Sequence, residues 1–175
     1  MLEQLKSRLQ VTYTKEHAKE LEEMEKVFHF EHFTSQDALK LGTQIVMEAK
    51  KYGRDLIVRI IRMEDQLAMF QYVGEEKSQR NIDFAMRKAK TVELTRHCSL
   101  WALVQAFGGG NIPSIFEEDI DFLPVGGAVP ILVDEKIVAI IAVSGLHEGM
   151  DHMVILEAIC KTKFCEIPDF HGKYV

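Results

Sequence analysis

Two pairs of short, β-branched segments, each joined by a brief acidic turn, constrain the fold of this chain more than any other feature. Leu56–Arg62 and Leu67–Tyr72 are connected around Glu64-Asp65, and Val129–Val133 and Ile137–Val143 are connected around Asp134-Glu135. Residues of this kind favour strands. Connections this short join antiparallel neighbours, because parallel strands need a crossover of a dozen or more residues. The chain is therefore predicted to contain an antiparallel sheet, with Ile137–Val143 as a fully buried strand.

Helical patterns surround these hairpins. Thr34, with Asp37 three residues later, is a typical helix start, apolar residues then recur at helical spacing from Ala38 to Ala49, and Gly53 is expected to end the helix. Further helices are predicted at about 79–95, 98–107 and 150–163. The order of elements indicates an α+β fold, a central antiparallel sheet flanked by helices, rather than a doubly wound sheet. The charged residues 1–27 are predicted to form an amphipathic helical extension that packs on the domain or on a second subunit, and residues 28–175 to form one domain.

Composition excludes several partner classes. A length of 175 residues fits one domain. The net charge of −6 argues against binding to nucleic acid or to anionic membranes. No apolar run reaches the length of a membrane span, and the first residues lack a secretory signal. Cys98, Cys160 and Cys165 are an odd number of cysteines without zinc-site spacing, which indicates reduced thiols and a cytoplasmic protein.

Two glycine-containing turns are candidate ligand contacts. Gly126 and Gly127 precede Pro130, so their backbone can approach a ligand closely, or can simply form a tight bend between strands. Ser144 and Gly145 end a predicted strand, where the hydroxyl of Ser144 would face a cleft or stabilise a turn. The nucleophile elbow G-x-S-x-G is absent, because the position two residues before Ser144 is an alanine.

His147, Asp151 and His152 form the most ligand-like cluster. If the last helix began early, His147 and Asp151 would lie one turn apart and would be able to share a metal. If it begins at Gly149, Asp151 caps the first turn instead. His152 lies on the apolar face of that helix, where we expect a partly buried, hydrogen-bonded imidazole. The functional alternative is that His152, or His147 beside it, donates to a metal such as haem iron.

The predicted middle helix carries a basic stripe in an otherwise acidic chain. Arg80, Phe84 and Arg87 are spaced i, i+4 and i+7, so two guanidinium groups are expected to flank one aromatic ring. This arrangement suits a flat anionic molecule, and the alternative is an ordinary charged surface that also includes Lys88 and Lys90. Cys98 follows His97, but adjacent residues on a helix do not face each other, so a Cys–His pair is not expected. Cys98 is instead expected to be a small buried residue.

Several stretches, taken in order, resemble one known family. They are 37–42 (DALKLG), 86–92 (MRKAKTV), 126–131 (GGAVPI), 143–146 (VSGL) and 151–152 (DH). Together they resemble the GlcG/PduO-C-terminal-like family, which includes haem-binding proteins of the HbpS type and small proteins described as haem-degrading domain-containing. The resemblance extends over about residues 27–163. It implies a profilin-like sheet, a homo-oligomer and, as in some relatives, binding of haem or another tetrapyrrole. The chain departs from the family pattern at three positions, with Val125 where a His often precedes the glycine pair, Phe84 in place of a Trp, and Cys98 in place of a Ser.

These observations predict a small-molecule-binding domain, acting in a homo-oligomer, whose ligand is haem, another tetrapyrrole or a different anionic molecule. Two alternatives stay open. One is an enzyme acting on a small anionic substrate, with His152 as the acid or base. The other is a protein-interaction or structural oligomer without a ligand. The enzyme is less favoured, because the sequence shows neither a paired nucleophile and base nor a complete set of metal ligands.

Overall fold

The computed structural model describes residues 2–118, 121–146 and 149–175. Within them the chain forms a four-stranded antiparallel sheet with strand order β2-β1-β4-β3. Its strands are β1 (Ile57–Arg62), β2 (Ala68–Val73), β3 (Ala128–Val133) and β4 (Lys136–Ser144). Both predicted hairpins are confirmed. The predicted residue His147 lies outside the described residues.

The two hairpins join along β1 and β4, which pair from Ile57 opposite Ser144 to Arg62 opposite Ala139. Strand β3 forms one edge of the sheet and carries Pro130, which an edge strand tolerates because one of its sides needs no ladder donors. The prediction that 137–143 is buried throughout is wrong at its start. Residues 139–144 are buried, whereas Ile137 and Val138 are only half-buried at the hairpin end.

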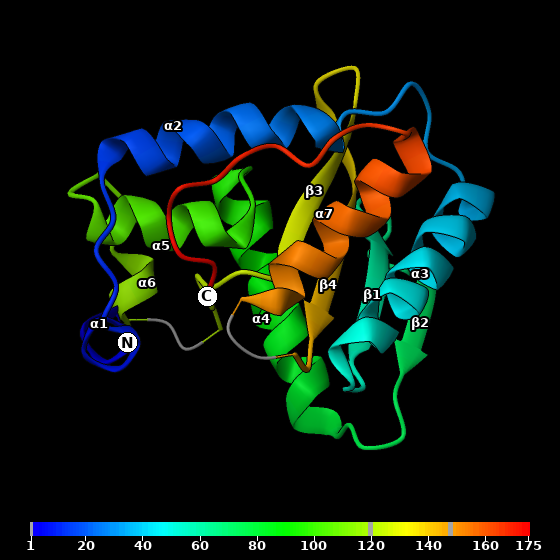
Figure 1. Ribbon diagram of the computed structural model, residues 1–175, viewed down its shortest axis with the longest axis horizontal. Helices are drawn as coiled ribbons and strands as arrows, with labels where there is room; N and C mark the ends of the chain where they lie inside the picture. The colour runs from blue at the N-terminus through cyan, green and yellow to red at the C-terminus, as the bar shows by residue number, and fades with distance from the viewer. Residues whose placement is uncertain (1, 119–120, 147–148) are drawn as a thin grey trace.

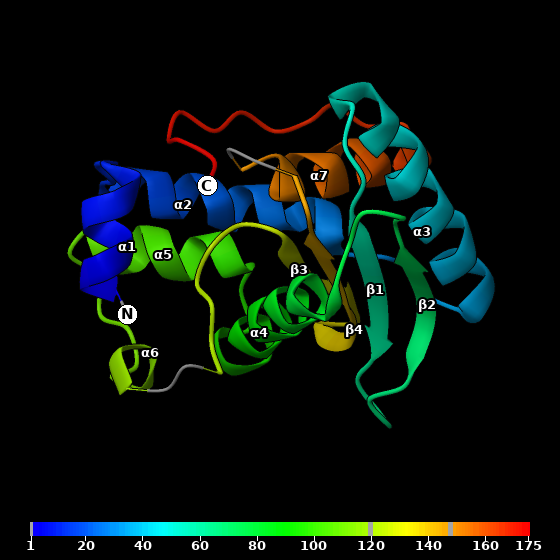
Figure 2. The same cartoon turned by 90° about the horizontal axis from the view of Figure 1, so that it is seen from below.

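Helices cover both faces of the sheet (Figures 1 and 2). Helices α3 (Ser35–Ala49) and α7 (Met150–Lys163) lie on one face, and α4 (Gln79–Thr95) lies on the other. The α4 interface combines four alanines with three larger apolar side chains: Ala85, Ala89, Ala128 and Ala142, and Ile61, Val92 and Ile140. This arrangement confirms the predicted α+β fold.

The start of α3 follows its sequence signal. The Thr34 side chain accepts a hydrogen bond from the Asp37 backbone N–H, and Asp37 Oδ2 accepts one from the Thr34 N–H at 2.7 Å. After α3, the short 3₁₀ helix η2 (Lys50–Tyr52) ends at Gly53 in a left-handed conformation.

The N-terminal residues pack on the domain itself. They form α1 (Leu2–Leu9), α2 (Lys15–Met24) and the 3₁₀ helix η1 (Glu25–Phe28). Helix α2 lies along α5 (Ser99–Phe107), and Leu21, Met24 and Phe28 are fully buried in the same core as the α3–α7 face of the sheet. A short helix, α6 (Ile115–Glu118), has no counterpart among the predicted elements.

Residues 164–175, here named the C-terminal strap, leave α7 at Phe164 and return along α2 (Figure 1, red). The Tyr13 hydroxyl donates to the Lys173 carbonyl at 2.6 Å, and the Gly126 N–H donates to the Val175 carbonyl at 2.5 Å. Gly149 has φ +79°, and a Cβ there would collide with Tyr174. The strap therefore lies tightly on the start of α7.

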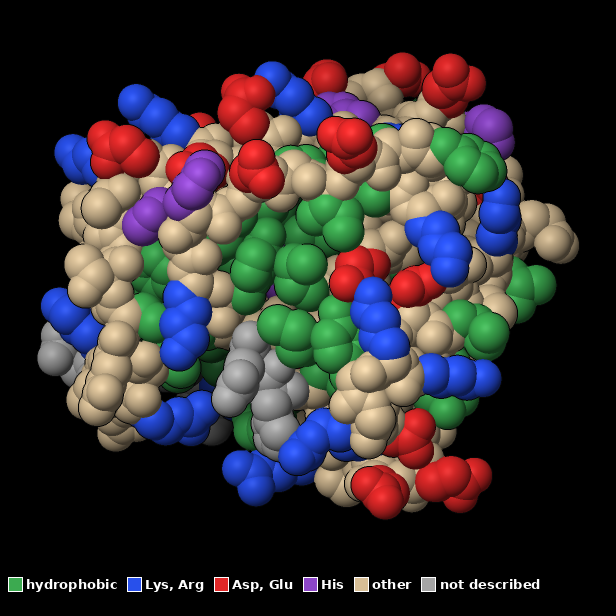
Figure 3. All heavy atoms as spheres, viewed as in Figure 1, with side chains coloured by type: hydrophobic (Ala, Val, Ile, Leu, Met, Phe, Trp, Pro, Cys, Tyr) green, Lys and Arg blue, Asp and Glu red, His purple; other side chains and the backbone are tan. Residues whose placement is uncertain are grey.

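The surface carries its charges unevenly. On the face shown in Figure 3, Asp and Glu side chains concentrate along the upper edge, where α2 runs, and several Lys and Arg side chains gather at the lower left. Within the described ranges, no helix combines the length and apolar character that crossing a bilayer requires.

Candidate functional site

A pocket of about 480 Å³ lies where α4, the end of β4 and α1 meet. We call it the basic pocket, and its lining residues are Leu5, Arg8, Arg80, Asn81, Phe84, Arg87, Lys88, Leu123, Val125, Ser144, Gly145, Leu146 and Asp151. Four of these side chains are basic and one is acidic, although the whole chain has a net charge of −6. Such a local excess of positive charge attracts anions.

The predicted basic stripe forms one wall of this pocket. The guanidinium carbon of Arg80 lies 5.2 Å from the centroid of the Phe84 ring, and that of Arg87 lies 5.7 Å from it. Arg87 also donates through Nη2 to the Phe122 carbonyl at 3.2 Å, which fixes its position. Two guanidinium groups therefore flank one ring, as the helical spacing predicts.

A buried ion pair forms the floor of the pocket. Lys88 Nζ donates to Asp151 Oδ2 at 2.8 Å and to the Val143 carbonyl at 3.1 Å. Asp151 Oδ1 accepts from the Leu146 N–H at 2.8 Å. Sequence reasoning missed this pair, because it joins residues on α4 and α7 that no local pattern connects. Asp151 lies in the first turn of α7, as expected for a helix with Gly149 as the N-cap residue, but its carboxylate does not cap that turn, since its backbone partner Leu146 precedes the helix.

The two predicted glycine turns take different places around this ion pair. Ser144 and Gly145 line the pocket, whereas Gly126 and Gly127 lie outside its lining. Gly127 has φ +120°, and a Cβ there would lie 2.6 Å from Lys88 Nζ and 2.8 Å from the Val143 carbonyl oxygen. Only glycine lets the start of β3 approach the buried lysine this closely.

His152 lies apart from the basic pocket. Its side chain is fully buried, and its ring stacks on Tyr174 of the strap with centroids 5.7 Å apart. Neither ring nitrogen has a hydrogen-bond partner among the described residues, so the expected hydrogen bond is absent there. Burial, and secondarily the Lys88 charge, lower the pKa of His152 to about 3. The imidazole is thus neutral at pH 7, and it is not among the residues that line the pocket.

No metal site accompanies this imidazole in the part of the chain that the structure describes, where no three His, Cys, Asp or Glu residues cluster as ligands.

Cys98 is buried as expected, and its neighbour His97 contacts Glu25 instead, with Nδ1 and Oε2 2.7 Å apart.

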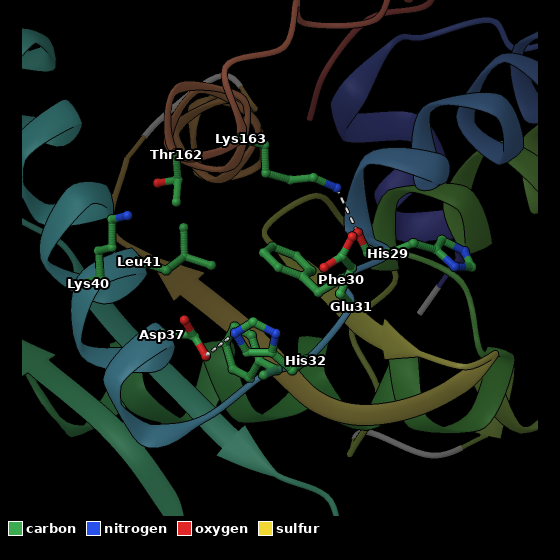
Figure 4. Close-up of a pocket in the computed structure, with 10 residues that line it drawn as sticks. His29, Phe30, Glu31, His32, Asp37, Lys40, Leu41, Thr162 and Lys163 are labelled. Atoms are coloured by element: carbon green, nitrogen blue, oxygen red, sulfur yellow. Dashed lines mark hydrogen bonds and ion pairs between the residues drawn. The ribbon is translucent and has the colours of Figure 1, made fainter.

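A second hollow, of about 510 Å³, lies between residues 29–33, α3 and the end of α7 (Figure 4). Its charges are more balanced, with Lys40 and Lys163 opposed by Glu31 and Asp37. Lys163 Nζ is already bound, donating to the Val27 and His29 carbonyls at 2.8 and 2.6 Å. This hollow is therefore a weaker anion site than the basic pocket.

The basic pocket also includes residues that sequence reasoning did not select. Leu5 and Arg8 belong to α1, in the predicted extension, and Leu123 belongs to the irregular segment before β3. Val125, which the sequence marks only as a departure from the family pattern, lies in the same segment. The basic character of Arg8 is visible in the sequence, but nothing near it indicates that α1 folds against α4.

Comparison with known proteins places this chain in a family. Residues 33–160 match the family model described as "Haem degrading protein HbpS-like". The chain belongs to this family. A UPF0303 protein of Pseudomonas entomophila is 30% identical over 146 residues, which cover 78% of this chain and 76% of that protein.

Solved structures share the fold. The crystal structure of the Ybr137w protein matches with a TM-score of 0.71 at 24% identity, covering 83% of this chain and 86% of that one. A crystal structure of a PduOC–haem complex matches with a TM-score of 0.63 at 15% identity, covering 73% and 93%. At these identities the likeness establishes the α+β architecture.

Proposed function

We propose that this protein binds a flat, carboxylate-bearing ligand of the tetrapyrrole class, such as haem, in the basic pocket. The observation that carries the proposal is the position of Arg80 and Arg87 around the Phe84 ring. An aromatic ring stacks on a flat macrocycle, and guanidinium groups bind carboxylates with two parallel hydrogen bonds. Arg8 adds a third guanidinium group to the same pocket.

The relatives support the tetrapyrrole class over other flat anions. The family is described as haem-degrading, and one protein of the same fold has been crystallised with haem. The macrocycle of haem carries two propionates, which matches a pocket with two guanidinium groups around one ring.

The residues of the basic pocket fit the macrocycle better than they fit its iron. Haem iron takes His, Cys, Met or Tyr as protein ligands. None of these residue types occurs among the lining residues named above, all of which the structure describes. Recognition in this pocket would therefore depend on the ring and its carboxylates. His152 does not line this pocket, so the alternative of an axial histidine, which the sequence left open, is not part of this proposal.

The chain is further proposed to act as a homo-oligomer. Strand β2 is an edge strand, and apolar side chains stand exposed both on it and on the neighbouring helix, at Val73, Leu39 and Met47. An unpaired edge beside exposed apolar side chains favours association with a second copy.

The ligand proposal is tested by titrating the protein with haemin and with iron-free protoporphyrin IX, following absorbance and tryptophan fluorescence. Both should bind saturably, with dissociation constants within about threefold of each other. Arg80→Ala and Arg87→Ala should each weaken binding by roughly tenfold or more, because a hydrogen bond to a charged group contributes about 1.5–3 kcal/mol. The dimethyl ester of protoporphyrin IX lacks both carboxylates, so it should bind more weakly to the unchanged protein than the free acid binds to either single variant.

Two control variants distinguish direct contact with the ligand from the effect of the protein's net charge. Lys90→Ala removes one positive charge from the same helix but outside the pocket, and Lys40→Ala removes one from the second hollow. Both should bind protoporphyrin IX with unchanged affinity. The proposal is overturned if Lys90→Ala weakens binding as much as Arg87→Ala, or if the Arg80 and Arg87 variants, folded by circular dichroism, bind normally. A loss of binding in Lys40→Ala alone would assign the ligand to the second hollow instead.

A further inference from the structure

The end of α7 brings two cysteines together. Cys160 lies in the last turns of the helix, and Cys165 is the second residue after it. Phe164, between them, has φ +55°, and the Cys165 N–H donates to the Cys160 carbonyl at 3.0 Å. The left-handed residue and the bond from Cys165 to Cys160 are features of a Schellman turn, in which the side chains at these two positions commonly contact each other.

The thiols themselves face the same region. Cys160 Sγ lies 3.5 Å from the carbonyl oxygen of Glu166, the residue after Cys165, so its side chain points toward the root of the strap. Burial raises the pKa of Cys160 to about 12, with a further contribution from a hydrogen bond to the Cys165 thiol. Cys160 is buried and Cys165 is exposed, so only one thiol of the pair is open to solvent.

We propose that Cys160 and Cys165 are a reversible redox pair that closes to an intramolecular disulfide at the root of the C-terminal strap. The two residues are held close by the backbone turn, and one of them is open to an oxidant. A small-molecule disulfide, with oxidised glutathione as the probe, is the class of oxidant that fits an exposed thiol at a surface turn.

The exchange balances in two steps. The Cys165 thiolate attacks one sulfur of oxidised glutathione, a mixed disulfide forms, and one glutathione thiolate leaves. The Cys160 thiolate then attacks the Cys165 sulfur, the Cys160–Cys165 bond forms, and the second glutathione leaves. The protein loses two protons and two electrons, and one oxidised glutathione becomes two reduced molecules.

The bond would fasten the strap at its root. The far end of the strap is held by the Tyr13–Lys173 and Gly126–Val175 hydrogen bonds, and its Tyr174 covers His152. A disulfide at Cys165 would add a covalent anchor at the opposite end of the same segment.

The disulfide can be detected by peptide mapping. Lys161 and Lys163 lie between the two cysteines, so trypsin places Cys160 and Cys165 on separate peptides. The native protein is incubated with oxidised glutathione, alkylated, digested and analysed by mass spectrometry without reduction. We expect the two peptides to remain joined, and to separate when dithiothreitol is added. Because the Cys160 thiol must ionise, closure from the mixed disulfide should accelerate about tenfold per pH unit between about pH 7 and 9.

Three serine variants provide the controls. Cys160→Ser should stop at a glutathione adduct on Cys165, Cys165→Ser should form neither product, and Cys98→Ser should close as the unchanged protein does. The proposal is overturned if the unchanged protein, folded by circular dichroism, accumulates only the glutathione adduct on Cys165. It is equally overturned if the only disulfide joins Cys165 residues of two chains.

Discussion

Replacing Asp151 with alanine should destabilise this protein severely, because Asp151 neutralises a buried lysine. Lys88 is only 4% exposed and Asp151 8%, so the lysine is poorly solvated once the carboxylate is gone. The variant leaves Lys88 Nζ with the Val143 carbonyl alone and removes the acceptor of the Leu146 N–H. Removing one partner of a buried ion pair lowers the free energy of unfolding by about 3–5 kcal/mol. We take this range to include the loss of the hydrogen bond to the Leu146 N–H. Total stabilities of ordinary domains are only about 5–15 kcal/mol.

Two further variants separate the loss of the charge from the loss of the hydrogen bond to the Leu146 N–H. Asp151→Asn keeps an oxygen for the Leu146 N–H and should cost roughly 1 kcal/mol less than Asp151→Ala. Lys88→Met combined with Asp151→Asn removes both charges and should be much less destabilised than the two single changes added together. The free energy of unfolding is measured by urea denaturation followed by circular dichroism. The reasoning is refuted if Asp151→Ala lowers the free energy of unfolding by less than about 1 kcal/mol. It is also refuted if the losses in Lys88→Met and Asp151→Asn simply add up in the double variant.

Two further predictions concern the strap and the assembly. The pKa of His152 is depressed to about 3 in the folded chain, whereas in the unfolded chain the same imidazole binds a proton below about pH 6.5. The free energy of unfolding should therefore be highest above pH 6.5 and should fall by about 1.4 kcal/mol per pH unit between about pH 6 and 3. His152→Leu should lose this contribution to the slope of urea-denaturation stability against pH, and an unchanged slope would contradict the burial argument. Light scattering should show a homodimer or larger closed oligomer, whereas a 20.0 kDa monomer at every concentration would refute self-association.

The basic pocket explains why two predictions that looked separate in the sequence concern one place. The basic stripe of α4 and the turn at Ser144 and Gly145 were independent candidates, and in the structure both line the same cavity. They are joined by the Lys88–Asp151 pair, which holds α4 against the end of β4 and the start of α7. Its loss should therefore disturb ligand binding as well as stability.

The elements of the fold were predictable because their signals are local. The β-branched hairpins, the Thr34–Asp37 capping box and the apolar spacing of α4 each act over a few residues, so the sequence alone determines them. The flanking of Phe84 by Arg80 and Arg87 was predictable for the same reason, since all three residues lie on one face of one helix.

Only the tertiary structure decided which residues share the pocket and which are shut away. Lys88 looked like one more surface cation on α4, yet it meets an aspartate 63 residues away and is buried. His152 looked like a hydrogen-bonded ligand candidate, yet the strap covers it with Tyr174 and leaves its nitrogens without partners among the described residues. The spacing of residues along one helix is set by its backbone geometry, whereas contacts between distant segments depend on how all the elements pack together.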